Sequence, residues 1–411
     1  MPEDKDNFNE IDDLLKGALS TPLPSTPITL RERFEKRAEE LKIAPTAALE
    51  ILNVEYRALK GILNGTQKNV DFTALSKLAR FIGISFPEII EMYVQSLGDK
   101  YKHEIGYTDK GKFILKNFDL ASLKKAGIID TINNFDHIEK QLLHLLGLKN
   151  IFDYNTDKIE AAFSAGKVEP KNAQTRDLWV WYASSQFEIF ANPYDYNKQA
   201  LVAYLPNIRW HSMDVEKGLY EVIRALYCLG VTVIFQPALP TLHLRGATFS
   251  VYNKPCIVLT DYKGYYPTLW FALIHELFHV LFDFDEIREN KYHLSDEETD
   301  VFTVKKNEQE ADKFARQYLF PNSKMDQVRL NINDSFFIEK FAKENHVHPS
   351  IIYVFHAFDR GKEDLKAWPR AVKKMPDIKI ALKSLDYFSW EDRKPAPDVA
   401  VRRKKTIFNN L

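Results

Sequence analysis

The chain has 411 residues, enough for two or three domains, and its 45% hydrophobic, 13% aromatic and 27% charged residues are typical of a folded globular protein. Its 56 basic and 57 acidic side chains give a net charge of −1, which excludes a global field drawing the chain to nucleic acid or membrane. Two cysteines, Cys228 and Cys256, exclude a disulfide framework, and we expect both to be small buried residues. The acidic N-terminal segment lacks a signal-peptide pattern, and every apolar run is too short to cross a bilayer. The sequence predicts a cytoplasmic protein without membrane association.

The first half of the chain is predicted to be helical. Residues 1–29 are acidic and then rich in Pro, Ser and Thr, which predicts a flexible arm. Residues 30–95 contain five short helical patterns and are expected to form a compact bundle. Residues 96–205 are helical and rich in aromatic side chains, and we interpret them as a connecting region.

Residues 206–370 are predicted to form a mixed domain, with a small sheet followed by helices. The predicted elements are a helix at 215–229, strands at 230–237, 247–251 and 256–260, and helices at 267–284, 307–320 and 336–360. Residues 371–411 lose this periodicity and end in the basic segment VRRKKTIFNNL, which predicts a mobile tail. The expected fold class is α+β, mostly helical, with the sheet packed on helix 267–284.

That helix carries His275, Glu276 and His279 in the segment LWFALIHELFHVLF, an H-E-x-x-H pattern. Two imidazoles four residues apart lie on one helical face and can hold a single Zn²⁺, with Glu276 beside them as a base. The helix is apolar nearly all round and is expected to be buried, where unpartnered imidazoles and carboxylates cost several kcal/mol. A zinc site removes that cost. The alternative is a pair of core histidines hydrogen-bonded to neighbouring backbone.

A catalytic zinc needs a third protein ligand, and the helix from residue 307 can supply it. On its helical wheel Glu308 lies close to the apolar face, Glu310 lies further from it as the fallback, and Asp312 can accept an N–H from a liganded imidazole. The longer H-E-x-x-H-x-x-G-x-x-H pattern fails because Phe282 replaces the glycine. Asp285 remains an alternative ligand at the last position of that pattern.

Such a ligand set leaves one zinc position for water, which favours amide hydrolysis with Glu276 as the base. The zinc would polarise the water and the carbonyl, and Glu276 would pass the proton to the leaving nitrogen. We also expect the strand at 256–260 to offer its backbone as a sheet edge to an extended peptide.

The N-terminal bundle contains two short predicted helices joined by a tight turn in AALEILNVEYRALKGILNG, which favours a helix-turn-helix. The candidate DNA-binding residues are Arg57, Lys60, Gln67 and Lys68. Residues 30–100 hold 11 basic and 10 acidic side chains, so their attraction to phosphate is modest and a homodimer would be needed for useful DNA affinity. The alternative is a bundle that binds protein or only dimerises.

Two groups of segments together resemble an XRE-type helix-turn-helix followed by an ImmA/IrrE-type zinc metallopeptidase domain. They are ALKGILNGTQKNVDFTALSKLARFIGIS in the first half, and GVTVIFQPALP, RGATFSVYNKPCIVLTD, LWFALIHELFHVLF and NEQEADKFARQYLFP in the second. The resemblance covers residues 30–95 and 206–360. It implies a zincin-like, gluzincin-like domain with one catalytic Zn²⁺ on His275, His279 and Glu308 and with Glu276 as the base. The family often has glycine before the second histidine, where this chain has Phe278.

The resemblance implies an intracellular regulatory endopeptidase coupled to a DNA-binding helix-turn-helix. Its expected substrate is a repressor or another partner protein in a stress, phage or mobile-element response. The alternative is an XRE-family transcriptional repressor or antitoxin whose zinc domain senses or binds a partner without proteolysis. A third class, a scaffold held by structural zinc, is disfavoured by the open coordination position.

Overall fold

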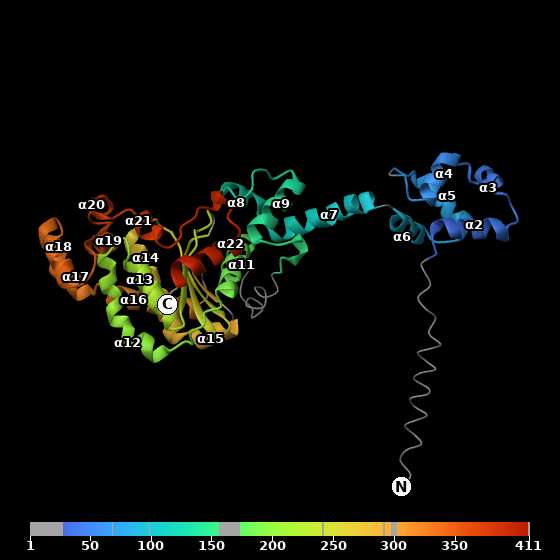
Figure 1. The fold of residues 1–411 in the computed structure, drawn as a ribbon. Helices are drawn as coiled ribbons and strands as arrows, with labels where there is room; N and C mark the ends of the chain where they lie inside the picture. Colours follow the sequence, from blue (N-terminus) through green and yellow to red (C-terminus); the bar gives the residue numbers. More distant parts are fainter. Residues whose placement is uncertain are drawn as a thin grey trace, which may run out of the picture. The chain divides into compact units, whose positions relative to one another are not determined.

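The computed structural model describes residues 28–67, 69–97, 99–155, 173–240, 242–290, 292–296 and 302–409. The chain divides into two units, residues 1–110 and 111–411, which are described separately below (Figure 1). Within the described ranges, every helix is too short or too polar to cross a membrane.

The first unit is a bundle of short helices with its own apolar core. Its helices are α2 (Leu30–Glu40), α3 (Pro45–Leu52), α4 (Tyr56–Leu63), α5 (Phe72–Ile82) and α6 (Phe86–Ser96), followed by the start of α7 (Asp99–Asn117). The hydroxyl of Thr29 and the carboxylate of Glu32 form a capping box on α2, and Asp71 and Ser85 cap α5 and α6. Asn53 adopts a left-handed conformation after α3, so that α4 begins after a turn of three residues. The five predicted helices of this bundle are confirmed.

The second unit begins with helices that share one core with the sheet. They are α8 (Leu120–Lys125), α9 (Phe135–Leu146), the 3₁₀ helix η1 (Ile151–Asp153), α11 (Ala173–Phe190), α12 (Lys198–Ile208), the 3₁₀ helix η2 (Arg209–Met213) and α13 (Gly218–Cys228). The rings of Phe187 on α11 and Phe249 on the sheet lie 5.6 Å apart. A separate connecting region at 96–205 is therefore wrong, because α11 packs on the sheet and the expected boundary at 205/206 falls inside α12.

The sheet has four strands in the order β1-β3-β2-β4. They are β1 (Thr232–Phe235), β2 (Leu244–Val251), β3 (Lys254–Leu259) and β4 (Tyr292–Asp296). β3 pairs in parallel with β1 and antiparallel with β2, and β2 pairs antiparallel with β4. Three of these strands were predicted. The expected sheet edge at 256–260 is wrong, because β1 and β2 flank β3 and satisfy both sides of its backbone.

Helix α14 (Tyr266–Phe282) lies on this sheet in contact with β2 and β3, and α16 (Phe302–Leu319) packs against α14 (Figure 1). α15 (Phe284–Asn290) lies between them in the chain, and the remaining helices before residue 375 are α17 (Asn322–Val328), the 3₁₀ helix η3 (Arg329–Asn331), α18 (Ser335–Glu344), α19 (Pro349–Arg360) and α20 (Ala367–Lys374). The predicted α+β, mostly helical class is confirmed.

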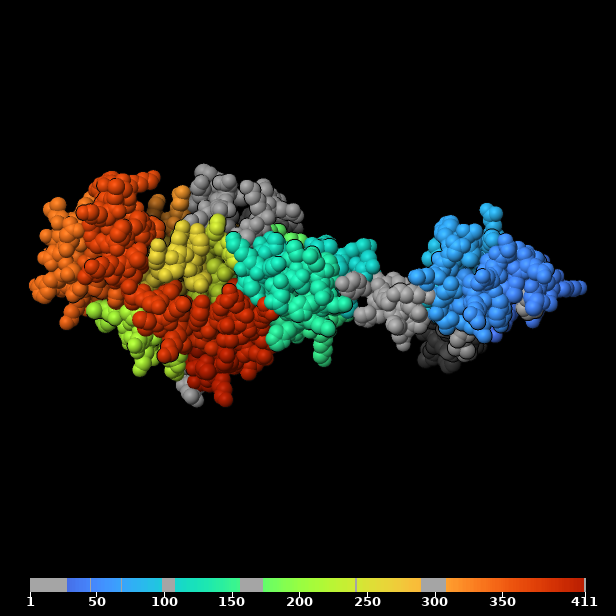
Figure 2. All heavy atoms as spheres, turned by 90° about the horizontal axis from the view of Figure 1, so that it is seen from above, coloured from blue at the N-terminus to red at the C-terminus, as the bar shows by residue number. Residues whose placement is uncertain are grey.

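The C-terminal segment is folded, and the predicted mobile tail at 371–411 is wrong. It forms α21 (Ile378–Lys383), the 3₁₀ helix η4 (Trp390–Asp392), α22 (Ala396–Arg403) and the single π-helical turn η5 (Lys404–Phe408). Figure 2 shows this segment, in red, lying against the green α8–α9 segment, where Arg393 donates to the Gly127 carbonyl at 2.8 Å.

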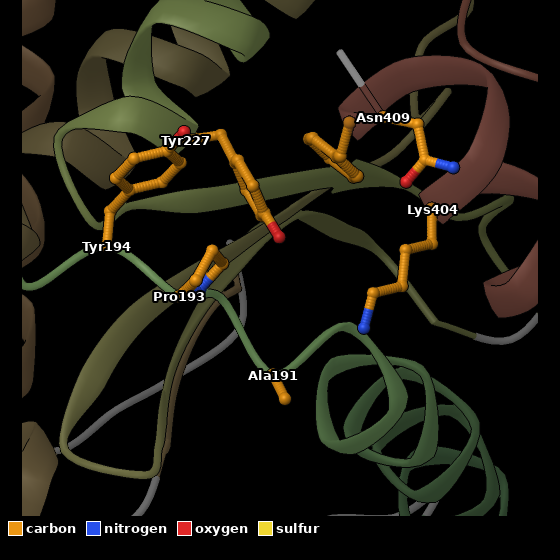
Figure 3. A pocket seen from close by; sticks show the side chains of 7 residues that line it. Ala191, Pro193, Tyr194, Tyr227, Lys404 and Asn409 are labelled. Atoms are coloured by element: carbon orange, nitrogen blue, oxygen red, sulfur yellow. The ribbon is translucent and has the colours of Figure 1, made fainter. Parts of the chain in front are cut away.

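The basic residues near the end of the chain favoured the prediction of a mobile tail, but one of them, Arg403, is buried. The Arg403 guanidinium is completely buried, stacks over Phe388 and donates to the Gln186 side chain at 2.8 Å. Burial lowers the pKa of Arg403 to about 10. Phe408 and Lys404 line a small cavity beside Tyr227 (Figure 3).

We expect Phe408→Ala to lower the free energy of unfolding of the protein by about 3 kcal/mol, because the buried ring packs 4.3 Å from Tyr227 and 5.3 Å from Phe190. Val401→Ala is the control, since that side chain is 60% exposed and its loss should cost less than about 0.5 kcal/mol. Urea unfolding measures both. Equal stabilities for the two variants would contradict a packed C-terminal segment.

The two cysteines differ in environment. Cys256 on β3 is buried, as expected, and burial raises the pKa of its thiol to about 12. Cys228 ends α13 and is exposed, so its predicted burial is wrong. Leu219, Val222 and Leu226 form the buried apolar face of this amphipathic helix, and Cys228 lies at its end on the face that is exposed to solvent.

Candidate metal centre

Two adjacent helices bring the polar residues of the site together inside the apolar core. Pro267 lies in the first turn of α14, and the helix then runs through a nearly continuous apolar sequence that buries all but a few of its side chains. Phe278 of α14 packs against Phe314 of α16, with ring centroids 5.6 Å apart. This contact is part of the packing that holds the two helices side by side, and Glu308 near the start of α16 faces the histidines of α14.

The three predicted ligands converge. His275 Nε2 lies 3.3 Å from Glu308 Oε2, and His279 Nε2 lies 3.2 Å from Glu308 Oε1. The two Nε2 atoms are 3.2 Å apart. All three side chains are buried, and their ligand atoms lie within 4.8 Å of one another. A metal ion at their centre would be within bonding reach of all three.

The other ring nitrogen of each histidine faces a carboxylate. His275 Nδ1 lies 2.9 Å from Asp312 Oδ1, and His279 Nδ1 lies 2.7 Å from Asp283 Oδ2. When each Nδ1–H donates to its carboxylate, both Nε2 lone pairs point to the centre. Carboxylate partners of this kind orient metal-binding imidazoles and raise their basicity. Asp312 therefore lies where it was expected, beside the Nδ1 atom of one of the two imidazoles.

Negative charge around the histidines changes their protonation. Burial lowers the pKa of His279, but the hydrogen bonds to Asp283 and Glu308 outweigh it and raise that pKa to about 10. Burial also opposes protonation of His275, and Asp312 and Glu308 again raise its pKa above the ordinary value. The cluster favours a bound positive charge, either protons or a metal cation.

Glu276 is completely buried next to the histidines and is held by β2. The Thr248 hydroxyl donates to Glu276 Oε2 at 2.7 Å. Gly246 makes room for the other oxygen, since a Cβ atom at that position would stand 2.5 Å from Oε1. Among the described residues, Glu276 Oε1 has no hydrogen-bond partner.

A metal ion fits these residues on two grounds. The donor set of two imidazole nitrogens and one carboxylate is sufficient for a cation with one open position. A buried carboxylate oxygen without a partner is costly in an apolar core, and such an oxygen is explained when a water or substrate group completes the site. The alternative of two core histidines bonded to backbone is wrong, because both rings contact carboxylates.

The two alternative ligands lie away from the centre. Glu310 is exposed on the outer face of α16. Asp285 has a side chain that is 92% exposed and forms an ion pair with Arg288. The helical wheel therefore selected the carboxylate that the structure brings to the two imidazoles.

The predicted DNA-binding residues lie in the first unit. Arg57 and Lys60 are exposed on α4, directly after the turn that follows α3. Gln67 is half-buried, donates to the Asn69 carbonyl at 2.9 Å and accepts from the Tyr93 hydroxyl through its own backbone carbonyl. Gln67 therefore stabilises the loop after α4. Lys68 lies outside the described residues.

Sequence reasoning missed three residues of the site. Asp283 follows His279 at a spacing of four on the same helical face, a signal that was available. Thr248 and Gly246 are brought to Glu276 only by the packing of β2 on α14. Neither could be found without that packing.

Comparisons of the chain with protein-family models, with curated proteins and with solved structures found no match.

Proposed function

We propose that the chain is a zinc-dependent endopeptidase with His275, His279 and Glu308 as ligands and Glu276 as the base. One observation carries the proposal: a buried imidazole–imidazole–carboxylate triangle lies beside a second buried carboxylate with an unpartnered oxygen. Zinc suits this donor set better than calcium or magnesium, which prefer oxygen ligands. The composition of the site and the H-E-x-x-H spacing together favour hydrolysis of an amide bond.

Bound zinc supplies Lewis acidity toward a water molecule and toward the substrate carbonyl. Glu276 accepts the proton of that water on Oε1, while the Thr248 hydroxyl keeps Oε2 in place. The protonated Glu276 then donates to the leaving amide nitrogen, and the peptide bond is broken with the addition of one water. Asp312 and Asp283 keep the imidazoles oriented during the cycle.

The biological role we propose is that of a regulatory protease whose N-terminal bundle binds DNA or a DNA-bound repressor, with a repressor or partner protein as the substrate. The exposed Arg57 and Lys60 beside a tight turn support the DNA contact. The alternative, a repressor or antitoxin without proteolysis, is favoured by the same bundle. A cleavage assay separates the two roles.

The assay incubates the purified zinc-loaded chain with a peptide library from a digested bacterial proteome. We expect new peptide termini that a chelator suppresses and that added zinc restores. Zinc at one ion per chain without new termini, together with tight operator binding, would favour the alternative. Absence of zinc from the chain would contradict both.

Removing the positive charges of α4 should weaken DNA binding uniformly across sequences. For Arg57→Ala and Lys60→Ala, each lost phosphate contact should flatten the slope of log K against log salt by about 1. Arg31→Ala is the control, because Arg31 is exposed on α2 and paired with Glu35. Fluorescence anisotropy across a salt series measures the slope. An unchanged slope in both α4 variants would exclude a phosphate contact from this helix.

A further inference from the structure

β2 is irregular where it passes the metal centre. Leu244 pairs with Asp296 and Gly246 pairs with Ser295, so Arg245 is an extra residue without a partner on β4. The Thr260 hydroxyl donates to the carbonyls of both Leu244 and Arg245, at 2.5 and 3.2 Å, and this fixes the bulge. A bulge bends the strand and redirects a side chain, and bulges occur often beside active sites.

The bulge changes the face on which Arg245 lies. In a regular strand Arg245 would point away from the face of its neighbour Gly246, which lies against Glu276. Instead its guanidinium lies over the Phe271 ring of α14, 5.9 Å from the centroid, and Arg245 Nη1 lies 3.1 Å from Asp312 Oδ1 of α16. The side chain therefore joins β2 to both helices of the metal centre.

The same oxygen of Asp312 serves two partners. Asp312 Oδ1 contacts Arg245 Nη1 at 3.1 Å and His275 Nδ1 at 2.9 Å. The Asp312 side chain is 41% exposed, and a carboxylate so open to water gains little from one hydrogen bond and can adopt other rotamers. A planar guanidinium that is only 21% exposed restricts those rotamers.

We propose that Arg245 is a positioning residue of the metal centre, which holds Asp312 against His275 and so fixes the imidazole that faces Glu308. This inference rests on the proposed function, because it assumes a metal at the three ligands. It assigns a role to a strand residue that neither contacts the metal position nor belongs to the H-E-x-x-H helix.

The direction in which zinc affinity changes when Arg245 is replaced distinguishes a positioning role from a simple electrostatic effect of its charge. A nearby cation repels a metal ion, so removing a bystander arginine should tighten zinc binding. If Arg245 orients the ligand system, removing it should weaken zinc binding instead, by about 10-fold. Arg245→Lys keeps the charge but replaces the planar fork with an ammonium group, so it should also weaken binding.

The experiment measures zinc affinity of the full chain by competition with a chromophoric chelator for wild type, Arg245→Met and Arg245→Lys. Arg316→Met is the matched control, since Arg316 on α16 pairs with Asp359 and stacks over Phe355 at 4.1 Å, away from the ligands. We expect both Arg245 variants to bind zinc about 10-fold more weakly and the control to match wild type. Unchanged or tighter binding in both Arg245 variants would overturn the inference.

A double-mutant cycle tests whether Arg245 acts through Asp312. Asp312→Ala should weaken zinc binding by about 10- to 100-fold, and adding Arg245→Met to it should cause little further loss. The visible spectrum of bound Co²⁺ should change in the same way in both single variants. If the losses of zinc affinity in the two single variants add up in the double variant, Arg245 has a separate structural role and does not act through Asp312.

His275→Ala keeps this inference separate from the proposed site. If His275→Ala binds zinc as tightly as wild type, the proposed metal site itself is wrong. If His275→Ala loses zinc while both Arg245 variants retain full affinity, the site stands and only the role of Arg245 is rejected.

Discussion

Glu276→Gln is expected to reduce peptide hydrolysis by about 10²- to 10⁴-fold while zinc remains bound. The glutamine has nearly the shape of glutamate and can still accept from the Thr248 hydroxyl, but its amide cannot take a proton from water. Because Glu276 is outside the ligand triangle, its loss should leave the zinc content at one ion per chain. kcat/KM on a cleaved peptide and metal analysis of the same sample measure the two effects.

Glu310→Gln provides the control for this experiment. Glu310 is an exposed glutamate on α16, two residues from the candidate ligand Glu308, and its replacement should leave kcat/KM unchanged. Full turnover by Glu276→Gln would remove the assignment of the base. Loss of zinc in that variant would instead make Glu276 a ligand.

The second large effect is expected from the ligands themselves. His275→Ala and Glu308→Ala should each lower zinc affinity by more than about 100-fold, because even the outer partners of a metal ligand are worth 10- to 100-fold. The two residues come from different helices, so loss in both variants requires that the helices meet at one ion. Chelator competition measures the affinities, and Glu310→Ala is the control for Glu308→Ala.

Removal of the zinc tests the alternative that the ion is structural and holds a scaffold together. The site lies within a core that also includes the sheet and many helices without ligands. We therefore expect the zinc-free protein to remain folded, with far-ultraviolet circular dichroism close to that of the zinc-loaded protein. Unfolding on chelation would show that the ion is structural, and zinc binding by Glu308→Ala at wild-type affinity would exclude Glu308 as a ligand.

The grouping of His275, His279 and Glu308 could be predicted because each part has a local signature. The spacing of His275 and His279 requires only helical geometry, and an apolar sequence around them indicates burial. Glu308 was identified by its angle to the apolar face of α16, and the packing of α16 on α14 turns that face toward the histidines. The remaining contacts of the centre depend on how β2 crosses α14, which no single segment encodes.

The errors in the fold have a common cause. The basic segment VRRKKTIFNNL predicted a mobile tail, but Arg403 within it is buried, and Gln186 and the Phe388 ring provide the partners that make this burial tolerable. These partners lie 217 and 15 residues away along the chain, so only the fold brings them together. β4 was missed for a similar reason, since its sequence YHLSD is mostly polar and its pairing with β2 defines it.

The packing of α22 and η5 makes the core of the second unit depend on residues that come late in the sequence. Residues 396–408 are translated about 90 positions after Glu308, yet their side chains fill the core between α11 and α13. When His275, His279 and Glu308 have all been synthesised, the chain still lacks the side chains of residues 396–408 that complete its core. We therefore expect the core of residues 111–411 to complete its packing only after residues 396–408 have been synthesised, later than all three residues of the candidate metal site.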